Sequence, residues 1–239
     1  QNVTFASGST LTLAATSTSG GNVTLSGDLT LNGTLDSNLG STFTFDGGSL
    51  QTVSGSALST SFPNLDVASG SSVDVTSGIK FQTEDAETLT IDNQGTIDFS
   101  TLEFSTASGS GDVSLSGNAV NVAGDLTSSS AVTVSGSALN MNGGGTQTIA
   151  AGNSTLPAIS VTSGTGVSPT LLSTGNILTI GGSLTINDGS FDAGTTGGNV
   201  DVDGSIDVVD GSLTLSTNAD ATYSLTGDFF VDDPNGSFT

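Results

Sequence analysis

The chain has 239 residues, of which 23 are acidic and one is basic, and it contains neither His nor Cys, so the formal net charge is −22. A single cation, Lys80, cannot neutralise phosphates, which excludes nucleic acids and anionic membrane surfaces as partners. The lack of His and Cys excludes Ser-His and Cys-His nucleophilic catalysis, the common zinc sites and a disulfide scaffold.

Apolar residues are numerous enough for a folded core, because Ala, Val, Ile, Leu, Met, Phe, Trp, Tyr and Cys make up 33% of the chain. No run approaches the 18 apolar residues of a membrane-spanning helix, so we expect no membrane insertion. The chain starts directly with the strand-like residues Val3 and Phe5, and we expect a processed mature protein or a fragment.

One short sequence motif, which we call the phrase, recurs along the chain: an apolar, a polar and an apolar residue, followed by small residues that include Gly. In chain order it occurs at 11–13, 23–27, 29–33, 43–47, 73–75, 113–117, 132–136, 178–181, 184–186 and 200–204. The alternation with period two predicts short strands with the apolar pair on one face and Thr, Ser or Asp on the other. The intervening Gly, Asn, Asp and Ser residues predict tight turns.

Two all-β architectures have short strands and turns at this spacing. One is a parallel β-solenoid (β-helix), in which short strands form coils that stack, and the other is an antiparallel β-sandwich array. The very short strands, the uniform tight corners and the presence of only 4 Pro residues favour the solenoid. We therefore predict one elongated, mostly parallel solenoid domain over 1–239, with about 22 residues in each of about 11 coils.

A long-range duplication supports this repeat architecture. The block 47–70 contains Gln51-Thr-Val53 followed by Pro63-Asn-Leu65, and the block 144–164 contains Gln147-Thr-Ile149 followed by Pro157-Ala-Ile159. These two blocks resemble the Gly/Ser/Thr/Asn-rich repeats of microbial surface adhesins and β-helical filament proteins. The resemblance implies a secreted, β-helical protein that is exposed on a surface or built into a fibre.

The densest carboxylate cluster is the segment 200–210, where Asp201 and Asp203 share one strand face and Asp207 and Asp210 follow. Stacked carboxylates of neighbouring coils are hard oxygen ligands, and we predict Ca²⁺ as their ligand; no other cofactor is expected. The alternative interpretation is a solvated acidic face that provides solubility.

Enzymatic activity is not expected. Paired carboxylates can hydrolyse glycosides, and β-helices host such enzymes. However, sugar binding commonly uses Trp, Tyr and Arg side chains, and the chain has no Trp, no Arg and one Tyr. Its corners are also too short to carry an active site. Glycosylation sequons occur about as often as chance predicts, at Asn2, Asn22, Asn32, Asn153 and Asn235.

Phenylalanines are the main large apolar side chains, and we expect Phe43, Phe45, Phe99 and Phe104 to stack inside the core. The adjacent pair Phe229-Phe230 must point to opposite faces, so that one ring lies outside.

The function predicted from the sequence is a structural subunit of an extracellular filament or surface fibre; the alternative is a stalk or passenger segment of a surface adhesin. A solenoid exposes unpaired strand edges at each end unless a polar or helical segment caps them, and we expect no such cap from this sequence. Open ends that pair head to tail give a filament whose only protein partner is the chain itself. The predicted interface residues are Val3, Phe5, Leu11 and Leu13 at one end, and Tyr223, Leu225, Phe229, Phe230, Val231 and Phe238 at the other.

Overall fold

The fold is an all-β parallel solenoid of about nine turns, as the phrase pattern predicts. The computed structural model describes residues 1–13, 20–37, 40–59, 61–83, 87–129, 131–151, 153–162, 165–170, 177–193, 199–216, 220–232 and 236–239. Strands that are neighbours in a sheet come from successive coils and run parallel, for example β10 (Ile79–Thr83) with β13 (Leu102–Thr106) and β24 (Leu184–Ile186) with β27 (Ile206–Val208). The antiparallel sandwich is therefore excluded.

The chain divides into two compact units, Gln1–Val120 and Asn121–Thr239. One copy of the duplicated block lies in each unit. The first unit contains β1 (Val3–Phe5), β2 (Thr10–Thr12), β3 (Asn22–Leu25), β4 (Leu29–Leu31), β5 (Thr34–Asp36), β6 (Thr42–Phe45), β7 (Leu50–Ser54), the 3₁₀ helix η1 (Ser56–Ser59), β8 (Asn64–Val67), β9 (Ser72–Val75), β10 (Ile79–Thr83), β11 (Thr88–Asn93), β12 (Thr96–Phe99), β13 (Leu102–Thr106) and β14 (Gly111–Gly117), and β15 (Val120–Val122) lies at the division.

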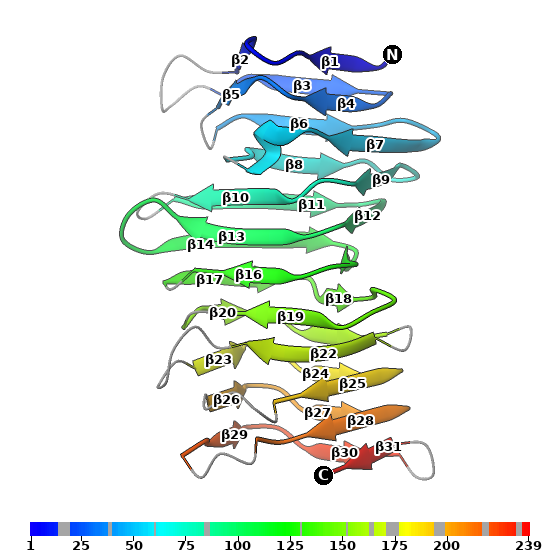
Figure 1. Ribbon diagram of the computed structural model, residues 1–239, viewed down its shortest axis with the longest axis vertical. Helices are drawn as coiled ribbons and strands as arrows, with labels where there is room; N and C mark the ends of the chain where they lie inside the picture. The colour runs from blue at the N-terminus through cyan, green and yellow to red at the C-terminus, as the bar shows by residue number, and fades with distance from the viewer. Residues whose placement is uncertain are drawn as a thin grey trace. The chain divides into compact units, whose positions relative to one another are not determined.

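Within the first unit the strands stack in rows, which we call walls. One wall has the order β1-β4-β7-β9-β12 and a second has the order β3-β6-β8-β11-β14 (Figure 1). The pairs β2-β5 and β10-β13 form shorter stretches, and η1 occupies the position between β7 and β8. Each coil therefore adds one strand to each wall in turn.

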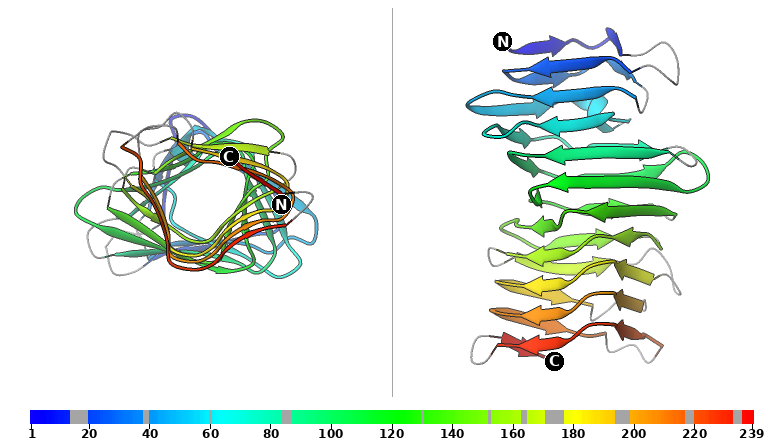
Figure 2. Two further views of the ribbon diagram at one scale, coloured as in Figure 1. Left: turned by 90° about the horizontal axis from the view of Figure 1, so that it is seen from below. Right: turned by 180° about the vertical axis from the view of Figure 1, so that it is seen from behind.

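The second unit is built in the same way. Its strands are β16 (Leu126–Ser128), β17 (Val132–Gly136), β18 (Leu139–Met141), β19 (Gln147–Ala150), β20 (Thr155–Leu156), β21 (Ile159–Val161), β22 (Thr165–Thr170), β23 (Ile177–Ile180), β24 (Leu184–Ile186), β25 (Gly189–Asp192), β26 (Asn199–Val202), β27 (Ile206–Val208), β28 (Gly211–Thr214), β29 (Tyr223–Leu225), β30 (Phe229–Val231) and β31 (Gly236–Phe238). They form the walls β18-β21-β24-β27-β30, β16-β19-β22-β25-β28-β31 and β17-β20-β23-β26-β29. Figure 2 shows the strands of this unit, coloured from green to red, stacked one above another.

Alternation along each strand produces the core. In β6, Phe43 and Phe45 are fully buried, whereas Thr42 and Thr44 are half-buried on the outer face. In β11 the same rule buries Leu89 and Ile91. The inward face of each wall is thus apolar, and the outward face carries Thr, Ser and Asp.

The corners are tight because the coils stack closely. Gly117 has a φ of +81°, a backbone conformation that favours glycine. A Cβ added there would overlap the carbonyl of Asn93 in the preceding coil, and a Cβ on Gly95 would overlap that of Ser71. Glycine at these corners therefore permits the close approach of one coil to the next.

Coil length varies although the strands stay in register. Leu139 pairs with Ile159, 20 residues on, whereas Val3 pairs with Leu29, 26 residues on. The uniform 22-residue coil of the sequence prediction is an idealisation, and the predicted number of coils, about 11, exceeds the roughly nine turns that the fold forms.

An aromatic lattice fills the core of the first unit. Phe43 stacks on Phe62 with ring centroids 5.1 Å apart, and Phe62 meets Phe81 edge to face at 5.8 Å. Phe81 also contacts Phe99 at 6.0 Å and Phe104 at 6.3 Å. The expected burial of Phe43, Phe45, Phe99 and Phe104 is confirmed. The ring contacts run from coil to coil through Phe62 and Phe81, which the sequence pattern did not single out.

Each unit also contains one buried glutamine that ties neighbouring coils together, which we call a glutamine clasp. Gln51 Oε1 accepts a hydrogen bond from Gly47 N–H at 2.8 Å, and its Nε2 donates to the carbonyls of Leu25 and Gly27 at 2.8 and 2.9 Å. Next to the clasp, Asp28 accepts the N–H of Thr52 at 2.9 Å.

The second clasp repeats the first group by group. Gln147 Oε1 accepts from Gly143 N–H at 3.1 Å, and its Nε2 donates to the carbonyls of Val122 and Gly124 at 2.7 and 2.6 Å. Asp125 accepts the N–H of Thr148 at 2.8 Å, as Asp28 does for Thr52. Both glutamines are buried, so each clasp satisfies backbone groups that are buried or partly buried.

Candidate assembly surfaces

The last three described strands form an open edge, which we call the trailing edge: β29, β30 and β31. Each of them is the terminal strand of its sheet among the described residues, so one side of its backbone pairs with no described strand. The opposite open edge, the leading edge, consists of β1, β2 and β3, which are also terminal in their sheets. Open parallel edges present unpaired N–H and C=O groups, which are a template for a further strand.

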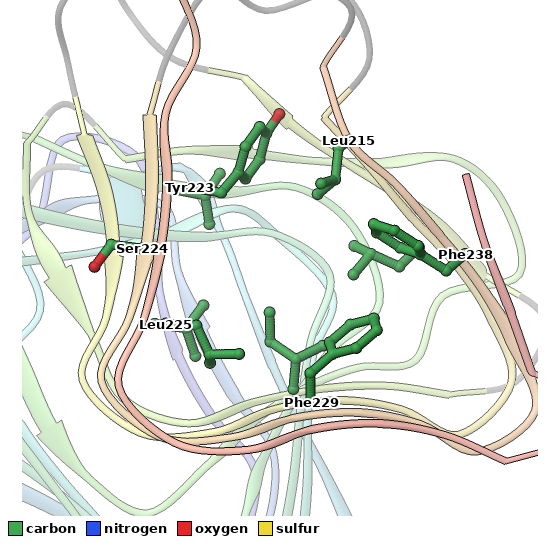
Figure 3. A pocket seen from close by; sticks show the side chains of 10 residues that line it. Leu215, Tyr223, Ser224, Leu225, Phe229 and Phe238 are labelled. Carbon is green, nitrogen blue, oxygen red and sulfur yellow. The ribbon is translucent and has the colours of Figure 1, made fainter.

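The trailing edge surrounds an apolar hollow of about 230 Å³. Its rim is formed by Leu215, Tyr223, Leu225, Phe229 and Phe238, whose side chains point inward, while Ser224 points away from it (Figure 3). The preceding coil contributes further apolar side chains, among them Val200, Val202, Ile206 and Leu213. The hollow is thus the continuation of the solenoid core.

Aromatic side chains of this edge are exposed to an unusual degree for a core position. Phe229 and Phe238 lie edge to face with ring centroids 5.1 Å apart, and they are 42% and 49% exposed. The in-register partners of these two residues one coil earlier are Ile206 and Leu213, and Leu213 is 2% exposed. One more coil would therefore bury the rings.

Phe230 points to the outer face, as the adjacency of the two phenylalanines requires, and is 55% exposed. Together with Val231 it lines a shallower depression that also contains Asp207, Val209 and Asp232. The residues predicted for this end therefore separate into two groups: Tyr223, Leu225, Phe229 and Phe238 gather around the hollow, whereas Phe230 and Val231 line the depression.

The leading edge is apolar on its inward face in the same manner. Val3, Phe5, Leu11 and Leu13 are half-buried rather than buried, whereas Leu29 and Leu31, one coil further in, are buried. Val3 N–H donates to the carbonyl of Asp28 at 2.8 Å, and the Asn2 side-chain amide donates to Asp28 Oδ2 at 2.9 Å. The first strand is thereby fixed against the second coil.

The strands of both edges carry no charged side chain, although Asp228 and Asp232 directly flank β30 at the trailing edge. No charged side chain precedes Asp28 in the sequence. On the trailing side the outward positions of β26 and β27 are Asp201 and Asp207, but their in-register partners on the edge strands are Ser224 and Phe230. At these two in-register positions the carboxylates therefore stop one strand before the edge. The sequence contains this signal, but it becomes readable only once the strand register is known.

The four aspartates predicted to bind Ca²⁺ are spread over several positions. Asp201 lies in β26 between Thr179 and Ser224, Asp207 lies in β27 between Thr185 and Phe230, and Asp203 and Asp210 are exposed beside these strands. Among the residues that the structure describes, no group of three or more acidic side chains lies close enough together to hold a metal ion. Ca²⁺ binding stays a prediction.

Carboxylates of neighbouring coils do stand side by side in the first unit. Asp74 in β9 pairs in register with Asp98 in β12, and Asp66 in β8 pairs with Asp92 in β11. Hydroxyls flank the second pair, since Thr44 donates to Asp66 at 3.1 Å and Ser116 donates to Asp92 at 2.8 Å.

The single basic side chain is held within a strand. Lys80 of β10 pairs in register with Glu103 of β13, and Lys80 Nζ lies 3.2 Å from Glu103 Oε1. The Lys80 side chain is 24% exposed.

Four of the five sequons can be placed. Asn2 and Asn153 use their side chains to bond the following coil: the Asn2 amide donates to Asp28, and Asn153 Oδ1 accepts the N–H of Ile177 at 2.7 Å. Asn22 and Asn32 are exposed. Asn235 lies outside the described residues.

No protein-family model matches the chain, and neither the search of curated proteins nor that of solved structures finds a match. Within the described part of the chain, no helix is both long and apolar enough to cross a membrane.

Proposed function

We propose that the protein is a structural subunit of an extracellular filament or surface fibre, and that it polymerises head to tail through its leading and trailing edges. The observation that carries this proposal is the apolar hollow of the trailing edge, which opens to solvent where the core of a solenoid would continue. A second copy, presenting Phe5 and Leu11 on its leading edge, is the partner that fits it.

Backbone geometry supports the pairing. Every parallel strand has the same pattern of N–H and C=O groups on corresponding edges, so the trailing edge of one copy is complementary to the leading edge of the next. Each main-chain hydrogen bond gained contributes about 1 kcal/mol. Because the two edges differ, the contact does not close on itself and generates an open filament.

Side-chain burial adds to this. Covering the exposed parts of Phe229 and Phe238 contributes on the order of 2 kcal/mol each at about 25 cal/mol per Å² of apolar surface. The uncharged residues before Asp28 are equally important, because a subunit of net charge −22 repels its copies unless the contacting surfaces carry no carboxylates.

Divalent cations belong to the same proposal. The repulsion that remains between packed subunits is screened by counterions, and the aspartates of 201–210 lie on the strands next to the trailing edge. We therefore expect Ca²⁺ to favour assembly and a chelator to oppose it.

An extracellular location is part of the same proposal. A trypsin-like protease has one side chain to recognise, Lys80, which lies on β10 and pairs in register with Glu103 of β13. Cleavage there requires local unfolding. The resemblance of the duplicated blocks to repeats of microbial surface adhesins supports a surface location too, and it favours the alternative function, a monomeric adhesin stalk.

Electron microscopy and sedimentation of the purified chain test the proposal, with Phe229→Asp as the decisive variant. The wild type is expected to form filaments, and the carboxylate placed in the apolar hollow should reduce the polymerised fraction about tenfold or more, since tenfold corresponds to about 1.4 kcal/mol. Leu50→Asp is the matched control, because Leu50 is 62% exposed and lies on β7, away from both edges.

The outcomes separate the two functions. Wild-type chains that stay monomeric at all concentrations, with and without Ca²⁺, would support the stalk. If the two variants polymerise equally, the trailing edge is not part of the assembly contact.

A further inference from the structure

The order of the strands along the chain determines which edge strands meet between copies. At the trailing edge the path runs β29, β30, β31, so that β29 ends the wall of β26, while β30 and β31 end the walls of β27 and β28. The edge is therefore stepped like the end of a screw thread: β30 and β31 already belong to the coil that follows β29. At the leading edge the path begins with β1, β2 and β3.

Two ways of joining the edges can be compared. If the next copy places its β1 on β30 and its β2 on β31, the outer side of β29 faces an empty position one strand wide, about 4.8 Å. The backbone groups of β29 then stay unpaired beside a closed core, which is unfavourable. Tyr223 and Leu225 also stay uncovered.

Resting on the proposed head-to-tail function, we propose that the next copy instead continues the thread: its β1 pairs with β29, its β2 with β30 and its β3 with β31. No strand position is left empty in this arrangement. Compared with the first arrangement, the next copy is rotated about the solenoid axis by the distance from one wall to the next. The backbones of the two copies then follow one continuous helical path across the contact.

The side chains agree with this arrangement at each of the three contacts. Val3 and Phe5 of the next copy cover Tyr223 and Leu225, and Phe5 enters the hollow. Leu11 lies over Phe229 and Val231, and Val23 and Leu25 lie over Phe238. On the outer face Thr4 stands beside Ser224, and both residues are exposed and uncharged.

Disulfide trapping tests this register. The chain has no Cys, so every cross-link comes from the introduced pair. The double variant T4C/S224C places the two Cys on paired parallel strands, whose separation of about 4.8 Å is within the Cα range of about 4.4–6.8 Å for disulfides. The double variant T4C/F230C is the matched control and reports the arrangement in which β1 meets β30. Both variants leave the hollow unchanged, and circular dichroism establishes that both fold.

After mild oxidation under assembly conditions, T4C/S224C is expected to give a ladder of covalent multimers on a non-reducing gel, at about tenfold or more the yield of T4C/F230C. A higher yield from T4C/F230C, or no cross-linking in either variant while microscopy still shows filaments, overturns the threaded register and leaves the filament function standing. If wild type and both variants stay monomeric, the filament function fails and the register fails with it.

Discussion

The two units of the molecule share one backbone plan but fill it differently. The first has an aromatic lattice of Phe43, Phe62, Phe81, Phe99 and Phe104, whereas the buried apolar side chains described in the second are aliphatic apart from Phe191 and Met141. Both nevertheless contain a glutamine clasp with the same set of partners. The core thus accepts different apolar side chains as long as their total volume fits. The backbone polar groups at the clasp corner, in contrast, need the same hydrogen-bond partner in both units.

The largest expected loss of stability comes from removing one ring of the aromatic lattice. Phe81→Ala removes a ring that contacts three others and should lower the free energy of unfolding by about 4 kcal/mol. Leu156→Ala in the second unit removes a fully buried aliphatic side chain and should cost about 3 kcal/mol. Urea denaturation gives the values, and hydrogen exchange should show each loss mainly in its own unit. A cost for Phe81→Ala below that for Leu156→Ala would contradict the special role of the lattice.

Breaking the clasps should have the next largest effect, and it should be equal in both units. Gln51→Leu leaves Gly47 N–H and the Gly27 carbonyl without their partner, and Gln147→Leu does the same to Gly143 and Gly124. Unsatisfied buried backbone groups cost about 1–3 kcal/mol each, so we expect a loss of about 3 kcal/mol in either case.

Gln94→Leu is the control for both clasps, because the exposed Gln94 side chain donates only to Asp92 on the surface, and its change should stay within about 0.5 kcal/mol. Clasp variants that differ from each other by more than about 1 kcal/mol would show that the core around the clasp, rather than the clasp itself, sets the cost.

The smallest effect concerns the outer faces, where the first unit carries aspartates in register on neighbouring coils. Asp98→Asn removes the repulsion from Asp74 and should stabilise the protein by about 0.2–1 kcal/mol in low salt. The gain should fade in high salt, because the charges are screened. Asp112→Asn, whose in-register partner is Thr88, should give no comparable gain. Denaturation curves at the two salt concentrations measure both variants; a gain for Asp98→Asn that is independent of salt would rule out repulsion as its cause.

Much of the fold follows from local sequence. Alternation with period two places Val53 inward, and by the same parity it places Gln51 inward, so the position of the glutamine, though not its partners, follows from the pattern. What the pattern does not contain is the alignment between coils. Phe62 lies outside the strands and meets Phe81 of β10 through an isolated parallel bridge, because corners of unequal length bring the two positions together. Corner length bears no simple relation to the phrases.

The assembly surfaces show the same division. The apolar residues of both edges were predicted from their place in the phrases, and the opposite orientation of Phe229 and Phe230 follows from strand geometry. The hollow itself and the uncharged outer positions of β29 and β30 depend on which residues of successive coils are partners. Long-range register, rather than local propensity, is the information that single-sequence reasoning lacks.

The variation of coil length from 20 to 26 residues has a practical consequence for protein engineering. The strands keep their pairing while the corners absorb the difference, so the corners are natural sites for grafting foreign peptides. A peptide inserted at one corner of each subunit would be displayed at regular intervals along a polymer, with the coil core and both joining edges left as they are.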